Sequence, residues 1–250
     1  MRGRTVLVTG GSRGLGRMMA RGLAEHGATV LATSRADAGP VDLAAEAADL
    51  PGAIVALHAD LATEDGCAAL AAAVAEHAGA LDVVVHNAGM TVAAPIEDHD
   101  DAVWDEVVDV NLKAVFHLTR FLLPSLRAAA ALRPPARVIT IGSASGIGVS
   151  RRENWSYGAT KAGVHHLTRH LALKLGPDIV CNTVAPGAFA TDMTDRMPPE
   201  WKDALIAGTP AGRMGTAADL VGAVVFLASP AGSFLTGTVL PLDGGLSLTT

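Results

Sequence analysis

The sequence has few of the residues that mark redox, metal-binding or nucleic-acid-binding proteins. It contains only 2 cysteines, Cys67 in an alanine-rich stretch and Cys181 in an apolar one, and neither has neighbours that form a metal or redox motif. We therefore expect both thiols to be buried and inert. The formal net charge of −6 argues against a general surface for nucleic acids.

Long apolar segments are also missing. No run approaches the roughly 18 apolar residues that a membrane span requires. The chain passes from Met-Arg-Gly-Arg directly into a strand-like segment, without an apolar leader. No Pro/Gly/Ser-rich linker divides the 250 residues, half of which are hydrophobic. The sequence thus predicts one domain over residues 1–250, in a cytoplasmic protein that binds neither membranes nor nucleic acids.

Short apolar runs alternate regularly with helical patterns along the chain. The candidate strands cover residues 5–9, 28–33, 53–58, 82–86, 137–141, 178–184 and 237–241. Strands that alternate with helices form parallel sheets, and right-handed crossovers place the helices on both faces. We therefore expect an α/β protein with a doubly wound Rossmann fold and a mostly parallel seven-stranded sheet. Ligands of such sheets bind at the carboxyl ends of the strands.

A glycine-rich loop follows the first candidate strand. It reads Gly10-Gly-Ser-Arg-Gly14-Leu-Gly16 and leads into a helical pattern from Met18 to His26. Glycines permit a tight turn and a close approach of ligand to backbone, and the N-terminus of a helix offers free N–H groups to a pyrophosphate. A strand, a glycine turn and a helix start together indicate a dinucleotide site.

A tyrosine and a lysine lie four residues apart, in Tyr157-Gly-Ala-Thr-Lys161, within a stretch that is typical of a helix. This spacing places both side chains on one helix face. A free phenol has a pKa of about 10, and a neighbouring ammonium favours the phenolate and so lowers that pKa. We therefore expect Lys161 to activate Tyr157 as an acid–base catalyst.

Further motifs occur in the order of one enzyme family. Besides the glycine loop after Thr9 and the tyrosine–lysine pair, the chain has His86-Asn-Ala-Gly89, Asn111, Ser143 and Pro186-Gly187. With these motifs, which extend over nearly the whole chain, the sequence resembles the short-chain dehydrogenases/reductases.

The resemblance implies a catalytic tetrad of Asn111, Ser143, Tyr157 and Lys161. In this tetrad Tyr157 donates a proton to the substrate oxygen, and Ser143 hydrogen-bonds the same oxygen. Lys161 also holds the nicotinamide ribose, and Asn111 supports a water that connects the lysine to solvent. Ser145 is the alternative to Ser143.

The end of the second candidate strand indicates which dinucleotide binds. Ser34-Arg35 stands where NAD-selective sites commonly place a carboxylate for the ribose 2′-OH. Arg35 can pair with a 2′-phosphate, and Arg13 in the glycine loop can supply a second cation, so the residues favour NADP(H). The resemblance implies further cofactor contacts from Gly10, Ser12, Gly14, Leu15, Gly16, Asp60, Leu61, Asn87, Ala88, Gly89, Val110, Pro186, Gly187, Phe189 and Thr191.

The remaining features concern the substrate and the assembly. We expect residues near 188–215 to cover the substrate, and Arg151 and Arg152 are candidates for attracting an anionic one. His166 and His170 share a helix face, but without a third ligand we expect no metal. Their helix, like the one predicted over residues 102–131, resembles those through which related subunits pair. We expect a homotetramer, with a dimer as the alternative.

The sequence thus predicts an NADP-dependent oxidoreductase. It would reduce a small-molecule ketone or a 3-oxoacyl group, such as an acyl thioester, to a secondary alcohol in a reversible reaction. The pattern is most similar to 3-oxoacyl-carrier-protein reductases. Two alternatives stay open: an NAD-linked dehydrogenase of sugar acids or polyols, and a nonenzymatic dinucleotide-sensing protein. Likeness of fold does not decide between them.

Overall fold

The computed structural model describes residues 1–35, 43, 45, 47–150, 152–191, 194 and 198–249. Its centre is a seven-stranded sheet in the order β3-β2-β1-β4-β5-β6-β7. The strands are β1 (Thr5–Val8), β2 (Thr29–Ser34), β3 (Ala53–His58), β4 (Val83–His86), β5 (Ala136–Ile141), β6 (Ile179–Pro186) and β7 (Val239–Leu242). Each neighbouring pair of these strands is parallel. The predicted single-domain Rossmann fold is confirmed, but the described sheet is wholly parallel rather than mostly so.

Apolar β-branched residues account for the central strands. β4 reads Val-Val-Val-His and β5 reads Ala-Arg-Val-Ile-Thr-Ile, and every residue of both is buried. Because helices cover both faces of a parallel sheet, its strands are apolar on both sides instead of alternating. All seven predicted strands are present with small shifts at their ends, and β6, for example, continues to Pro186.

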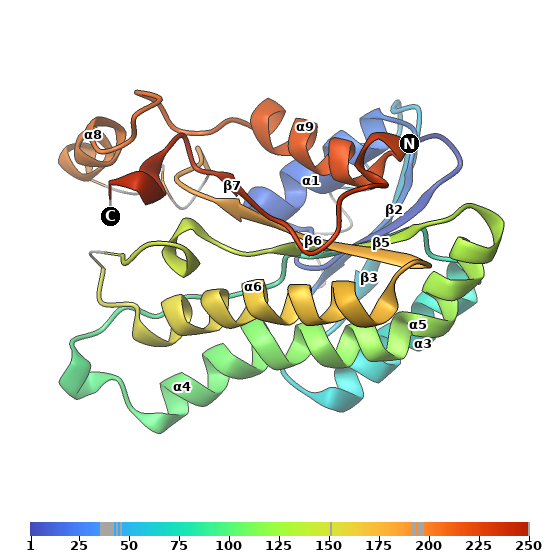
Figure 1. Cartoon of the computed structure of the whole chain (residues 1–250), viewed down its shortest axis with the longest axis horizontal. Coiled ribbons are helices and arrows are strands. Elements are labelled where there is room, and N and C mark those ends of the chain that lie inside the picture. Colours follow the sequence, from blue (N-terminus) through green and yellow to red (C-terminus); the bar gives the residue numbers. More distant parts are fainter. Residues whose placement is uncertain are drawn as a thin grey trace.

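Helices cover the two faces of the sheet in separate layers (Figure 1). One layer holds α1 (Gly14–Glu25) and α9 (Ala217–Ala228), and the other holds α3 (Glu64–Ala78), α5 (Ala114–Leu132) and α6 (Trp155–Leu175). Further helical segments among the described residues are α4 (Asp101–Val108), α8 (Pro199–Ala207), the π-helical η2 (Asp109–Lys113) and the 3-10 turns η1 (Ile96–Asp98), η3 (Ala144–Gly146), η4 (Pro230–Gly232) and η5 (Leu246–Leu248).

Two apolar cores lie between the sheet and these layers. Met19 and Leu220 belong to the core beneath α1 and α9, whereas Leu70 and Leu118 belong to the core beneath α3 and α5. Full burial of such a side chain stabilises the fold by about 1.5–3 kcal/mol. The cores hold the sheet between its two helix layers, and the loops at its carboxyl edge start from these packed strands.

The helix predicted over residues 102–131 is interrupted by a wider turn. α4 ends at Val108, the π-helical η2 covers Asp109–Lys113, and α5 begins at Ala114. Single π-turns inside α-helices occur frequently at functional sites. The buried Asn111 lies in this turn. The prediction of one regular helix was therefore wrong at the position of a candidate catalytic residue.

No helix in the described part of the chain combines the length and the apolar character needed to cross a membrane.

Candidate active site

The glycine loop joins β1 to α1, as predicted. Gly10 has a φ of +64°, a conformation that residues with a side chain rarely adopt. At Gly16 the constraint is space, because an ideal Cβ would lie 2.0 Å from the carbonyl oxygen of Gly10. α1 begins at Gly14, before the predicted Met18, and its N-cap residue Arg13 makes no side-chain capping hydrogen bond. The N–H groups of the first turn are thus suited to bind a phosphate.

Asn87 holds this loop from the neighbouring strand. Its Nδ2 donates hydrogen bonds to the carbonyl oxygens of Thr9, at 2.8 Å, and Gly10, at 3.1 Å. The Thr9 hydroxyl accepts hydrogen bonds from the backbone N–H groups of Asn87 and Ala88. The resemblance implied that Asn87 contacts the cofactor. In the structure its side-chain amide instead hydrogen-bonds the backbone of the glycine loop.

The two arginines that the sequence predicted to bind a 2′-phosphate are both exposed. Arg13 lies in the glycine loop and Arg35 directly follows β2, after the buried Ser34. The carbonyl oxygen of Arg35 lies 3.2 Å from Nε2 of His58, at the end of β3, and this contact fixes the backbone that carries the guanidinium.

The loops after β3 and β4 converge on η2. Leu61, Ala88 and Val110 line one small hollow next to Thr9. Asp60 is exposed, and its Oδ1 accepts a hydrogen bond from the N–H of Ala62 at 3.1 Å. The structure thus brings together Leu61, Ala88 and Val110, for which the resemblance implied cofactor contacts.

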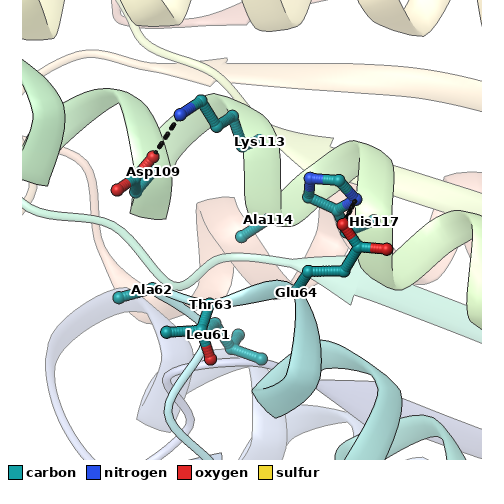
Figure 2. Close-up of a pocket in the computed structure, with 8 residues that line it drawn as sticks. All are labelled: Leu61, Ala62, Thr63, Glu64, Asp109, Lys113, Ala114 and His117. Carbon is teal, nitrogen blue, oxygen red and sulfur yellow. Dashed lines mark ion pairs between the residues drawn. The ribbon is translucent and has the colours of Figure 1, made fainter.

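A second hollow of about 220 Å³ adjoins the first, between the start of α3 and η2 (Figure 2). Leu61 lines both hollows. In the second, Lys113 pairs with Asp109 at 2.7 Å and His117 lies 3.7 Å from Glu64. None of the four catalytic candidates lines it.

Tyr157 and Lys161 lie one turn apart on α6, as predicted. The Lys161 Nζ is 5.6 Å from the centroid of the Tyr157 ring, and it donates a hydrogen bond to the carbonyl oxygen of Ile141 at 2.7 Å. Ser143 follows β5, and its side chain hydrogen-bonds the Tyr157 phenol. Ser145 instead donates its backbone N–H to the Ser143 hydroxyl oxygen at 3.1 Å. Ser143 is therefore the serine that acts on the tyrosine.

Burial is the main cause of the pKa shifts of Tyr157 and Lys161. It raises the pKa of Tyr157, and the hydrogen bond with Ser143 offsets the rise only in part. It also lowers the pKa of Lys161 to about 8, because the ammonium loses hydration. The expectation that Lys161 lowers the pKa of Tyr157 is therefore wrong for this arrangement. The ammonium faces the ring and binds a backbone carbonyl.

Asn111 connects η2 to two other segments. Its Oδ1 accepts a hydrogen bond from the N–H of Met90, and its Nδ2 donates one to the Met90 carbonyl oxygen, both at 2.9 Å. Nδ2 also donates to the hydroxyl of Thr160 on α6 at 3.2 Å. An ideal Cβ on Gly89 would lie 3.1 Å from Asn111 Oδ1 and 3.6 Å from Lys161 Nζ. Asn111 Oδ1 and Lys161 Nζ therefore both lie next to Gly89.

The segment after β6 runs along the same edge. At Gly187 an ideal Cβ would lie 2.7 Å from Cα of Asp243, so Pro186 and Gly187 are packed closely. Phe189 is buried in the core and forms an isolated bridge with Gly215, so its ring is not available to a ligand. The N–H of Thr191 donates to the Thr194 hydroxyl at 2.8 Å.

The predicted substrate-covering segment, near residues 188–215, is described in part. It contains α8, in which every residue is at least partly exposed and Trp201 is 58% exposed. Residues 192, 193 and 195–197 lie outside the described residues, as does Arg151. Arg152 is described and exposed.

Known proteins match the chain along almost its entire length. Residues 10–247 match a family model described as enoyl-(acyl carrier protein) reductase. A rhamnolipid-biosynthesis 3-oxoacyl-[acyl-carrier-protein] reductase from Pseudomonas aeruginosa is 40% identical over 249 residues, with 98% of this chain and 97% of that protein covered. The chain belongs to the short-chain dehydrogenase/reductase family.

Other members of the short-chain dehydrogenase/reductase family are nearly as similar. A gluconate 5-dehydrogenase from Gluconobacter oxydans is 36% identical over 255 residues, with 98% of this chain and 95% of that protein covered. The solved structure of a Pseudomonas aeruginosa RhlG/NADP active-site complex has a TM-score of 0.94 at 39% identity, and 99% and 97% of the two chains are covered.

Two buried histidines of this short-chain dehydrogenase/reductase contact the site but were not singled out in the sequence. Nε2 of His99 lies 2.9 Å from the hydroxyl of Ser156, next to the tyrosine. Nε2 of His165 accepts a hydrogen bond from the N–H of Ser143 at 3.4 Å. The sequence could have indicated His165, because it follows Lys161 by four residues and so shares its helix face. Nothing local in the sequence indicates His99.

The other candidates show no chemistry of this kind. The rings of His166 and His170 lie 5.2 Å apart and both residues are exposed. Within the described ranges, no three or more His, Cys, Asp or Glu side chains gather as a metal site would require. Cys67 and Cys181 are buried as predicted, and burial raises the pKa of their thiols to about 11 and about 12.

Proposed function

We propose that this protein is an NADPH-dependent reductase that converts a 3-oxoacyl group, or a related ketone, to a secondary alcohol in a reversible reaction. The observation that carries the proposal is the convergence of Tyr157, Ser143 and Lys161 at the sheet edge that also holds the glycine loop. The names of full-length relatives, 3-oxoacyl-[acyl-carrier-protein] reductase among them, support the same reaction.

The glycine loop fits a dinucleotide. The space that a Cβ at Gly16 would fill is taken by the loop's own backbone, so the loop stays tight against the N-terminus of α1. Arg13 and Arg35 are exposed, and two cations after the first and second strands would attract a 2′-phosphate, which supports NADPH over NADH. When bound, NADPH supplies the hydride that reduces the carbonyl carbon.

The chain's own residues supply the proton and hold the oxygen. Because its pKa is raised, Tyr157 remains protonated at neutral pH and can donate its hydroxyl proton to the carbonyl oxygen. Ser143 has one hydroxyl proton, which hydrogen-bonds the Tyr157 phenol in the free protein and can turn to that oxygen when substrate is bound. Lys161, with a pKa of about 8, is mostly protonated at pH 7 and can return a proton to the tyrosine. Asn111 holds η2 against α6, beside the lysine.

Exposed apolar side chains favour an acyl substrate over a sugar acid. Ile147 directly follows η3, Val149 lies two residues further, and Trp155 begins α6, with exposed fractions of 45%, 81% and 43%. The Trp155 Nε1 donates a hydrogen bond to the carbonyl oxygen of Ala94 at 3.2 Å, which connects the start of α6 to the segment after β4. An alkyl chain gains from burying such surfaces, whereas a polyhydroxylated acid does not. We infer that residues 198–215, with α8, cover the bound chain.

Exposed apolar residues also support a homotetramer, with a dimer as the alternative. Phe116 on α5 is 45% exposed and Leu173 on α6 is 76% exposed, and both helices belong to one layer of the fold. Pairing through this layer would bury both side chains. We place the assembly in the cytoplasm. Light scattering in solution tests the subunit number.

A panel of substrates tests the proposed reaction. NADPH consumption is measured with 3-oxoacyl thioesters of increasing chain length, a simple ketone, a ketosugar acid and an enoyl thioester. We expect kcat/KM for the longer 3-oxoacyl thioesters to exceed that for the ketosugar acid by roughly 10- to 100-fold. Faster turnover of the ketosugar acid with NADH would show a sugar-acid dehydrogenase instead. Preference for the enoyl thioester would show a double-bond reductase, and tight NADPH binding without any turnover would show a sensor.

A further inference from the structure

His165 lies at the junction of the two segments that carry the proposed catalytic residues. It is 5% exposed and follows Tyr157 by eight residues and Lys161 by four on α6, so the three side chains share one helix face. The ring meets the turn after β5, from Gly142 to Gly146, which contains Ser143.

Two glycines make room for the imidazole. An ideal Cβ on Gly142 would lie 2.2 Å from His165 Nε2, and one on Gly146 would lie 2.7 Å from its Cε1. Both distances are shorter than real Cβ atoms tolerate, so the turn encloses the ring only because these positions lack side chains. The fit between the ring and the turn is therefore specific.

The imidazole hydrogen-bonds both ends of this turn. Its Nε2 accepts a hydrogen bond from the N–H of Ser143 at 3.4 Å, and the backbone of Gly146 hydrogen-bonds the same ring. An imidazole with one acceptor nitrogen is neutral. Burial, together with the charges of Lys161 and Arg169, lowers the pKa of His165 to about 4, so the neutral form prevails at physiological pH.

We propose, on the basis of the function proposed above, that His165 is a positioning residue that fastens the Ser143 turn to α6 and thereby sets the hydrogen bond between Ser143 and Tyr157. Two successive turns of α6 are hydrogen-bonded to the end of β5. Lys161 donates to the carbonyl oxygen of Ile141, and His165 accepts from the N–H of Ser143. The histidine connection is independent of where the lysine ammonium points. The serine turn therefore keeps its place when Lys161 binds another partner.

The test compares two substitutions of His165. His165→Leu fills the space with a side chain that cannot accept a hydrogen bond, whereas the amide oxygen of His165→Gln can accept one from the Ser143 N–H. His166→Leu, at the exposed neighbouring position, is the matched control. Turnover and KM with a 3-oxoacyl thioester, NADPH affinity, and the absorbance titration of the chain's single tyrosine are measured. We expect His165→Leu to lower kcat by about 10- to 100-fold, since small misplacements of catalytic groups have effects of this size. NADPH affinity should hardly change.

The titration separates this proposal from the proposed function, because it needs no turnover. His165→Leu should raise the Tyr157 pKa, as loss of the Ser143 hydrogen bond would, and His165→Gln should restore most of the wild-type value. In a Ser143→Ala background, adding His165→Leu should leave the tyrosine pKa where Ser143→Ala put it. An unchanged titration midpoint in folded His165→Leu would overturn the proposal, as would additive shifts in the double variant. If His165→Leu does not fold, His165→Ala takes its place, and an unchanged titration midpoint, or an equal nonzero shift with and without Ser143→Ala, would overturn the proposal.

Discussion

The ammonium of Lys161 donates a hydrogen bond to the carbonyl oxygen of Ile141 at 2.7 Å, at the point where β5 ends. The lysine is 5% exposed, so this carbonyl and the nearby Tyr157 ring replace much of its hydration. Burial lowers its pKa to about 8. The folded chain thus keeps a charged group in place that would be more stable in water.

Replacing the lysine by an apolar residue of similar length should stabilise the fold. Between pH 8 and 10.5 the unfolded chain holds the lysine proton and the folded chain does not, so the stability of the wild type rises with pH in this window. We expect Lys161→Met to raise the free energy of unfolding at pH 7 by about 1–2 kcal/mol, because loss of the Ile141 hydrogen bond offsets part of the gain. Turnover should be lost.

Denaturant unfolding at a series of pH values measures this effect. The difference between Lys161→Met and the wild type should be largest below pH 8 and shrink toward pH 10.5. A difference that stays constant over this range would show that the buried charge is not its source.

The single tyrosine of the chain makes the proposed proton donor visible by absorbance. Burial raises the pKa of Tyr157 and the Ser143 side chain lowers it, so Ser143→Ala should move the titration midpoint further upward. Ser233→Ala, directly after η4, should leave the midpoint unchanged. A downward shift in Ser143→Ala would mean that the serine does not stabilise the phenolate.

Cofactor preference should depend on the exposed arginine after β2. Arg35→Asp replaces a partner of the 2′-phosphate by a repelling charge. We expect it to shift the preference from NADPH toward NADH by about 1–3 kcal/mol, the scale of hydrogen bonds to charged groups. Steady-state kinetics with both cofactors measure the shift, and Arg127→Asp on α5 provides the same charge change elsewhere. Equal preferences in the two variants would make Arg35 a bystander.

The glycine loop should tolerate no side chain at Gly16. Gly16→Ala places a methyl group against the Gly10 carbonyl, and we expect a loss of about 1–3 kcal/mol in stability and weaker NADPH binding. Gly222→Ala is the matched comparison, because its Cβ on α9 meets no atom within 4 Å. That change should stabilise the helix by about 0.5–1 kcal/mol. Thermal unfolding with and without NADPH distinguishes these outcomes.

The sheet could be predicted from the sequence because its central strands are buried on both faces. The run at residues 83–85, for example, consists of three valines, and such runs alternate with helical patterns along the chain. The spacing of Tyr157 and Lys161 placed them on one helix face for an equally local reason. The glycine loop was recognisable because Gly10 and Gly16 satisfy backbone constraints that act within seven residues.

The features that could not be predicted depend on contacts between distant segments. The π-turn holds Asn111 against Met90, and the apolar pattern of the helix continues through it without a break. Lys161 meets the Ile141 carbonyl, a backbone group that no residue type reveals. The Tyr157 pKa was predicted in the wrong direction because the sequence shows a charged neighbour but not the depth of burial.

Tyr157→Phe tests the central claim, that Tyr157 donates the proton in an NADPH-dependent carbonyl reduction, more directly than any other change. The variant keeps the ring and removes only the hydroxyl, and the measurement is single-turnover reduction of a 3-oxoacyl thioester with NADPH affinity determined on the same sample. We expect the rate to fall by about 10²- to 10⁴-fold, the usual contribution of general acid catalysis, while NADPH affinity stays within about threefold of the wild type. A rate within about tenfold of the wild type would contradict the assignment of Tyr157 as the proton donor.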